Sequence, residues 1–127
     1  MMSRAHWALL VSTLFMACGC GSSEEANFGS AREAYLEAMQ AAQQGDAAKA
    51  IEGLTASLAA VPAAATYMER AKLYLAEGRQ DEALQDCQAA LELDPENEDV
   101  KWLLGEVKKP EKERFKGDQQ APPSSGK

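Results

Sequence analysis

The sequence predicts an all-α protein, a short α-solenoid of two helical hairpins followed by a C-terminal capping helix. The middle of the chain, about eighty residues, is rich in Ala, Leu, Glu and Gln. No run there alternates with the period of two that marks a half-buried strand. Two further observations are a repeat with a period of 33 residues and an apolar stripe with helical spacing at the end of the block. Together they favour stacked helical hairpins over any sheet.

The repeat consists of four pairs of identical residues, each pair 33 positions apart. The pairs are Gly45 and Gly78, Ala50 and Ala83, Leu58 and Leu91, and Pro62 and Pro95. Four coincident spacings at one period indicate two copies of one unit. In each copy the glycine can take the positive φ that ends a helix, and the proline closes the helix that follows. We therefore predict hairpins over residues 31–63 and 64–97.

Residues 98–109 are predicted to form the capping helix. A stripe with i, i+3, i+4, i+7 spacing runs along it, formed by Val100, Leu103, Leu104 and Val107. Lys101 and Lys108 occupy places that an internal repeat would make apolar. That face is therefore expected to meet water.

Residues 64–97 resemble the tetratricopeptide repeat, a helix–turn–helix unit whose copies stack into a superhelix. The matching positions are the aromatic residues Tyr67 and Tyr74, the small residues Ala71, Ala83 and Ala90, the turn glycine Gly78 and the final Pro95. Arg70 replaces the usual Leu. Residues 31–63 match the pattern less well, as terminal repeats often do. The resemblance implies a TPR domain over residues 31–109, whose first helices line a concave face that binds an extended peptide or a partner helix.

The N-terminal 17 residues have the layout of a signal peptide, with Arg4 before an apolar run from Trp7 to Ala17. The run is too short to span a membrane as a helix. "LFMAC" resembles the lipobox of bacterial lipoproteins, which implies that Cys18 is lipidated, with Cys20 as the fallback. Plain secretion and a retained anchor stay open as alternatives. Residues 18–30 are predicted to be a flexible linker, and residues 110–127 a disordered tail.

This reading places the protein in a bacterial cell envelope, lipid-anchored and facing the periplasm or the cell surface, with secretion as the alternative. The whole chain has a net charge of −7. Cleavage before Cys18 removes Arg4 and leaves 12 basic and 20 acidic residues, a formal charge of −8. Such an acidic chain is not expected to bind nucleic acid. Contact with a membrane is expected to come from N-terminal acyl chains rather than from charge.

The sequence does not predict an enzyme, a cofactor or a metal site. The single histidine, His6, lies in the signal peptide, and no phosphate-binding loop or nucleophile motif is present. Cys87 falls at an inward position of its helix, so it is predicted to be a buried small hydrophobe. Cys20 and Cys87 leave open a disulfide outside the cytoplasm or a metal carrier, although two thiolates make a weak metal site.

The resemblance assigns the peptide-binding groove to the first helix of each unit. The predicted groove residues are Arg32, Tyr35, Met39, Met68, Lys72, Leu75 and Trp102. Trp102 lies opposite the apolar stripe of the cap, so it is predicted to point outward as an interface residue. Relatives that grip acidic tails use a clamp of Lys, Asn and Arg. Here only Lys72 is basic among the corresponding positions, which favours an apolar or weakly basic partner segment.

Three functions compete at this point. The first is a membrane-tethered adaptor or scaffold that binds a protein or peptide segment in an envelope assembly. The second is a structural module completed by homo-oligomerisation, suggested by a repeat number below the three usually needed for stability. The third is a small-molecule or metal carrier that uses Cys20 and Cys87.

Overall fold

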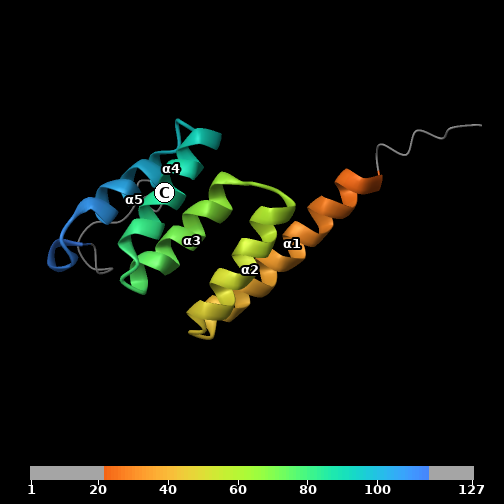
Figure 1. Ribbon diagram of the computed structural model, residues 1–127, viewed down its shortest axis with the longest axis horizontal. Coiled ribbons are helices and arrows are strands. Elements are labelled where there is room, and N and C mark those ends of the chain that lie inside the picture. Colours follow the sequence, from red (N-terminus) through yellow and green to blue (C-terminus); the bar gives the residue numbers. More distant parts are fainter. Residues whose placement is uncertain (1–21, 115–127) are drawn as a thin grey trace, which may run out of the picture.

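The structure, a computed structural model, describes residues 22–114, which form five α-helices and one short 3-10 helix. The elements are α1 (Ser22–Gln43), α2 (Ala47–Ala60), α3 (Ala64–Ala76), α4 (Gln80–Leu93), α5 (Glu98–Lys108) and η1 (Glu111–Glu113). α1 pairs with α2 and α3 with α4 in two helical hairpins, and α5 packs mainly on α4 (Figure 1). α2 also contacts α3, so the hairpins stack as a short helical solenoid.

The two turn glycines adopt the backbone conformation that the repeat predicts. φ is 81° at Gly45 and 75° at Gly78. Just past each glycine the chain closes the helix end, with Asp46 N–H donating to the Ala41 carbonyl at 3.0 Å and Arg79 N–H to that of Tyr74 at 2.8 Å. These bonds satisfy carbonyl groups that the helix end would otherwise leave unpaired.

The second hairpin and the cap share one core of small side chains. This C-terminal core consists of Ala71, Ala83, Cys87, Ala90, Val100, Leu103 and Val107. The three alanines are fully buried, and their small side chains let the backbones of α3 and α4 approach closely. Cys87 is also fully buried. Tyr67, Tyr74, Leu84 and Leu91 pack around this core, half-buried.

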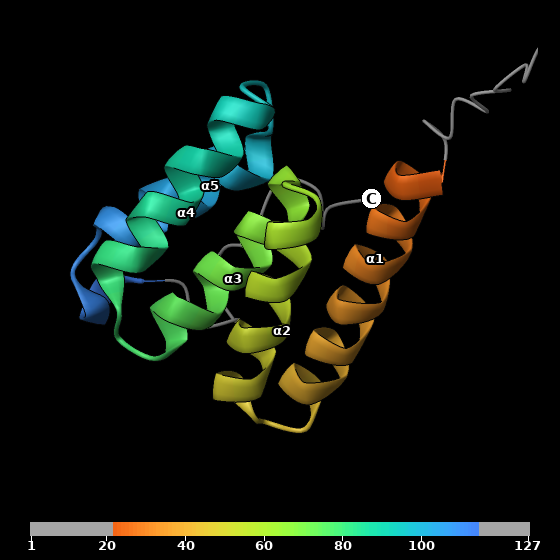
Figure 2. The same cartoon turned by 45° about the vertical axis from the view of Figure 1, so that its right-hand side comes forward.

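The first hairpin has an even smaller set of large buried side chains. Leu54 is fully buried and Leu58 nearly so, while most of the other buried positions are alanines on α1. α1 and α2 run side by side (Figure 2). A Cβ atom placed on Gly53 would lie 2.8 Å from Ala38 Cβ and 3.2 Å from the Ala34 carbonyl oxygen. Gly53 is therefore needed for this close approach.

Two glycines inside helices are expected to respond in opposite ways to the same substitution. A Cβ atom on Gly105 of α5 meets nothing within 4 Å. Gly105→Ala should therefore raise the free energy of unfolding by about 0.5–1 kcal/mol through helix propensity alone. Gly53→Ala should not raise the free energy of unfolding, because the new methyl group would force Ala38 to move away. Urea unfolding followed by circular dichroism measures both, and equal stabilisation by the two substitutions would contradict the close approach.

The helical part of the chain begins earlier than the sequence suggested. Residues 22–30 were predicted to belong to a flexible linker, but α1 starts at Ser22 and continues without a break to Gln43. Glu24 and Glu25 in the first turn favour the helix because carboxylates interact well with its N-terminal dipole. The Gly/Ser-rich composition that indicated a linker is concentrated upstream, at residues 19–23. All side chains of residues 23–30 are exposed.

The chain also stays ordered slightly beyond the cap. Residues 110–127 were predicted to be disordered, but residues 111–113 form η1 and the Arg114 side chain is hydrogen-bonded to α4. The remaining tail lies outside the described residues. The same holds for the signal peptide, Cys18 and Cys20. Within residues 22–114, no helix has both the length and the apolar character that a bilayer crossing requires.

Candidate functional site

A cavity of about 330 Å³ opens between α3 and α5, at one end of the predicted groove. It is lined by Lys72, Leu75 and Ala76 from α3, by Trp102, Leu103 and Glu106 from α5, and by Arg114 after η1. Three of the residues predicted for the groove, Lys72, Leu75 and Trp102, thus surround one space. The cavity has about ten times the volume that a water molecule occupies in the liquid.

Trp102 does not point freely outward as predicted. It is half-buried and packs against the C-terminal core. The prediction considered only the face of α5 that meets α4, but α5 also contacts α3, which covers the other side of the helix. The Trp102 side chain therefore contributes to holding the cap and also lines the cavity.

The other predicted groove residues lie apart from this cavity. Arg32 is exposed on α1, and Tyr35 and Met39 are half-buried on the same helix. Met68 packs against the C-terminal core, in agreement with the general preference of Met for cores. Burial raises the pKa of the Tyr35 hydroxyl, and the nearby Glu69 carboxylate of α3 raises it further. Tyr35 of α1 therefore lies near the Glu69 carboxylate of α3.

Charged groups on the rim of the cavity are partly neutralised. Lys72 Nζ donates to Glu69 Oε1 at 2.8 Å, and Lys109 pairs with the buried carboxylate of Glu106. Arg114 is different. Its Nε donates to the Lys109 carbonyl oxygen at 3.0 Å and its Nη2 to Gln80 Oε1 at 2.7 Å, and both acceptors are uncharged.

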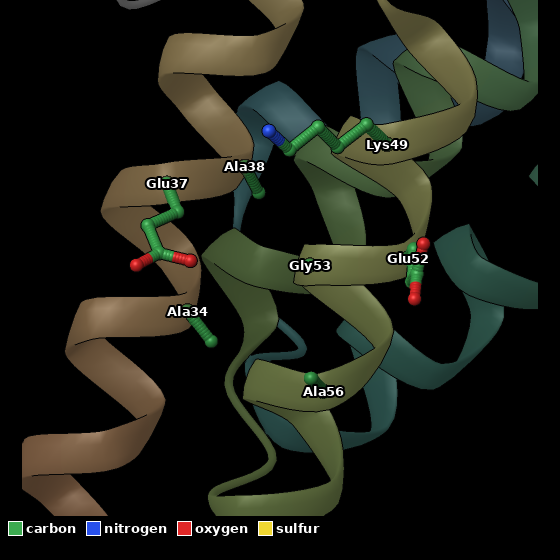
Figure 3. Close-up of a pocket in the computed structure, with 7 residues that line it drawn as sticks. All are labelled: Ala34, Glu37, Ala38, Lys49, Glu52, Gly53 and Ala56. Atoms are coloured by element: carbon green, nitrogen blue, oxygen red, sulfur yellow. The ribbon is translucent and has the colours of Figure 1, made fainter.

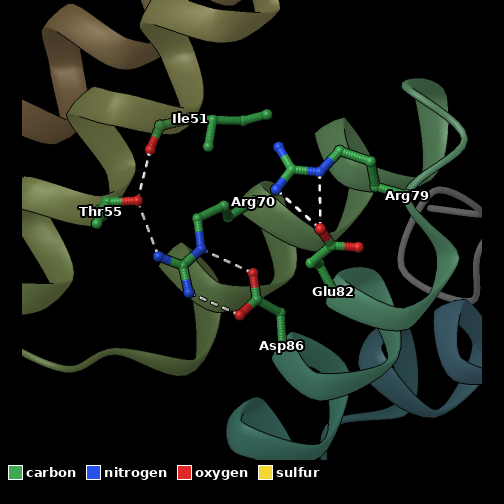
Figure 4. Close-up of polar contacts among 6 residues, drawn as sticks. All are labelled: Ile51, Thr55, Arg70, Arg79, Glu82 and Asp86. Atoms are coloured by element: carbon green, nitrogen blue, oxygen red, sulfur yellow. Dashed lines mark hydrogen bonds and ion pairs between the residues drawn. The ribbon is translucent and has the colours of Figure 1, made fainter.

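A second group of polar contacts links the two hairpins. Arg70 forms two parallel hydrogen bonds with Asp86, Nε to Oδ2 at 2.8 Å and Nη2 to Oδ1 at 2.7 Å. Its Nη1 donates to Thr55 Oγ1 at 2.9 Å (Figure 4). The guanidinium also lies 5.7 and 5.6 Å from the ring centroids of Tyr67 and Tyr74. The hydrogen bonds to Asp86 raise the pKa of Arg70 above its usual value.

This constellation was missed in the sequence, where Arg70 read only as a replacement for an apolar residue. A signal was available. Asp86 lies 16 positions later at an inward position of the partner helix, so two opposite charges occupied core positions of one hairpin. Because buried charges are normally paired, this coincidence predicts an ion pair. Arg70 joins α2, α3 and α4, and it has a structural role.

Another cavity, of about 270 Å³, lies between the two helices of the first hairpin. Ala34 and Ala38 of α1 face Gly53 and Ala56 of α2 across it, with charged side chains at its edge (Figure 3). It is the shallow space left by the close approach at Gly53. None of the residues predicted to bind a partner lines it.

Cys87 is expected to be unreactive in the folded protein. Burial raises the pKa of its thiol to about 11, with a smaller contribution from the carboxylate of Asp86. At pH 8 roughly one thiol in a thousand is then a thiolate. In a chain carrying Cys18→Ser and Cys20→Ser, reaction with a disulfide reagent at pH 8 should be at least about 100-fold slower when folded than in urea. Equal rates would contradict the burial.

Among residues 22–114, no three or more His, Cys, Asp or Glu side chains form a group that could hold a metal ion. Cys20, the other residue of the carrier hypothesis, lies outside this range. Within residues 22–114, Cys87 is packed in the C-terminal core and lies near the carboxylate of Asp86.

Comparison with known proteins agrees with the helical repeat. Residues 64–97 match the model of the tetratricopeptide repeat family. The chain is also similar to sperm-associated antigen 1 of Mus musculus, with 45% identity over 65 residues. This match covers 51% of the chain but only 7% of the length of that relative. The chain therefore contains a tetratricopeptide repeat, a unit that generally mediates protein–protein interaction and is generally not enzymatic.

Proposed function

We propose that this protein is a non-enzymatic adaptor that binds a protein or peptide segment in the groove formed by α1, α3 and α5. The observation that supports it best is the cavity between Leu75 and Trp102, because both side chains are large, apolar and only half-buried. Interfaces are enriched in aromatic residues and concentrate their binding energy in such pockets. The tetratricopeptide repeat at residues 64–97 supports the same class of function.

A pair of photo-crosslinkers tests this proposal. Benzoylphenylalanine at Ala76, which lines the cavity and is exposed, should capture the partner in cells. The matched control is Ala59, an exposed alanine on α2 that lines none of the cavities described above. Mass spectrometry then identifies the captured proteins. Capture from position 59 but not from position 76 would move the binding surface away from the groove.

We further propose that the adaptor is tethered to a bacterial cell-envelope membrane through acyl chains on Cys18, with Cys20 as the fallback. The lipobox-like "LFMAC" and the apolar run before it support this. Metabolic labelling with a fatty-acid analogue should label the wild type and Cys20→Ser, but not Cys18→Ser. Loss of label only in Cys20→Ser would assign the anchor to Cys20, and a secreted, unlabelled wild type would exclude lipidation.

A second candidate function is self-association. Phe28 and Leu36 lie two helical turns apart on α1 and are 64% and 54% exposed. Residues spaced in this way share one face of a helix, so the two side chains form an apolar patch with Arg32 between them. Sedimentation velocity compares the wild type with Phe28→Ser/Leu36→Ser. A wild-type dimer that the double substitution dissociates would favour this candidate, and a wild-type monomer would exclude it.

A further inference from the structure

On the basis of the proposed groove function, we propose that the cavity between α3 and α5 takes a bulky apolar side chain that is flanked by carboxylates. The partner is then an acidic–aromatic or acidic–aliphatic segment, such as Asp or Glu on either side of Phe or Leu. This differs from the apolar or weakly basic segment that the sequence favoured. The main reason is Arg114, a cation that the positions of the repeat motif do not include.

The apolar part of the inference rests on the cavity walls. Leu75 and Ala76 on one side and Trp102 and Leu103 on the other leave about 330 Å³ between them. Binding pockets for whole small molecules begin at about this size, so the space suits one large side chain rather than a whole helix. Apolar walls favour an apolar occupant, because filling the cavity removes apolar surface from water on both sides.

The acidic part rests on Arg114 and Lys109. Both come after the last residues of the cap stripe, and η1 brings the side chain of Arg114 back to the cavity. Within residues 22–114 no carboxylate forms an ion pair with Arg114, whose two hydrogen-bond acceptors are neutral oxygens. A guanidinium has five N–H donors in a planar fork, so a partner carboxylate can still be bound by those that remain.

The charge of the groove is opposite to that of the whole protein. Around the cavity the cations are Lys72, Lys109 and Arg114, and the carboxylates are Glu69 and Glu106. These groups carry a formal charge of +1, whereas the chain carries −7. An acidic segment is repelled by most of the surface and attracted here, which directs it to the groove. A basic segment would be drawn to the other faces.

Four capped heptapeptides test the inference on the full chain. They share the frame acetyl-Gly-Ser-X-Z-X-Ser-Gly-amide, with Asp-Phe-Asp, Ser-Phe-Ser, Lys-Phe-Lys or Asp-Ala-Asp in the centre. In a Trp7→Phe background Trp102 is the sole tryptophan, so its fluorescence reports on the cavity. At low salt we expect Asp-Phe-Asp to bind about tenfold more tightly than Ser-Phe-Ser. Lys-Phe-Lys and Asp-Ala-Asp should bind more weakly than Asp-Phe-Asp by at least as much.

A matched pair of substitutions locates the preference. Arg114→Gln should remove most of the advantage of Asp-Phe-Asp over Ser-Phe-Ser. Lys112→Gln removes an exposed cation two positions earlier, outside the cavity lining, and should change neither affinity. Raising the salt concentration should also reduce the advantage, because surface charges are screened.

Several outcomes would overturn the inference. Equal or tighter binding of Ser-Phe-Ser or Lys-Phe-Lys would do so, and so would a failure of all four peptides to bind. A change of Trp102 fluorescence on Phe115→Ala, with none on adding peptide, would assign the cavity to the chain's own tail instead. The photo-crosslinker at position 76 decides the groove function separately. If a partner is captured there but the peptides show no preference for carboxylates, the proposed groove function stands and only the acidic character of the partner segment is refuted.

Discussion

Replacing Arg70 by alanine is expected to lower the free energy of unfolding by about 3–5 kcal/mol, the usual cost of leaving a buried charge without its partner. Asp86 is the charge in question, and its side chain is only 6% exposed. Removing Arg70 takes away both hydrogen bonds to that carboxylate, the bond to Thr55 and the contacts with two tyrosine rings. Domains of this size are stable by about 5–15 kcal/mol, so the loss should be a large fraction of the total.

Urea unfolding followed by far-ultraviolet circular dichroism measures the loss. Arg79→Ala is the matched control, because Arg79 also lies over the ring of Tyr74, at 4.5 Å, but pairs with Glu82 at the surface. Water screens that pair, so its loss should matter much less.

The double variant Arg70→Leu/Asp86→Leu removes both charges. It therefore separates the cost of leaving Asp86 without a partner from the net contribution of the ion pair to the free energy of unfolding. Apolar side chains of similar size often replace buried ion pairs with little loss or with a gain. We therefore expect the double variant to be clearly more stable than Arg70→Ala. If Arg70→Ala cost less than about 1 kcal/mol, the constellation would not hold the hairpins together.

Leu54→Ala is the second large effect, with an expected loss of about 2–5 kcal/mol. Leu54 is fully buried and has the largest volume among the fully buried side chains of the described residues. Its surroundings in the first hairpin include Ala38 and Ala50. Alanines have no side-chain torsions with which to fill the space that the substitution creates, so most of the cavity should remain.

Leu93→Ala provides the matched control for Leu54→Ala. Leu93 ends α4 and is 51% exposed, so the same deletion of atoms should change the free energy of unfolding by no more than about 0.5 kcal/mol. The two variants are compared by the same urea titration. Equal losses would mean that the first hairpin is loosely packed around position 54.

The helices and their turns were predictable because their signals are local. Gly45, Gly78 and Pro95 fix where helices end through their own backbone preferences, and in the structure a helix ends two residues before each of them. The small positions Ala71, Ala83 and Ala90 were likewise identified, from the resemblance to the tetratricopeptide repeat.

Features that depend on several elements at once were missed. The Arg70–Asp86 pair needs two helices to meet in one register, and the half-burial of Trp102 needs α5 to touch α3 as well as α4. Arg114 was assigned to the tail, because nothing in its own neighbourhood indicates that η1 returns its side chain to the cavity. For residues 22–30, composition favoured a linker, but a helix already formed from residue 31 onward needs no new nucleation to extend.

The early start of α1 limits how far the protein can reach. Four residue steps separate Cys18 from Ser22, and a fully extended chain spans at most about 15 Å over that distance. If Cys18 carries the proposed acyl chains, the first turn of α1 is held within about 15 Å of the lipidated residue, and therefore close to the bilayer surface.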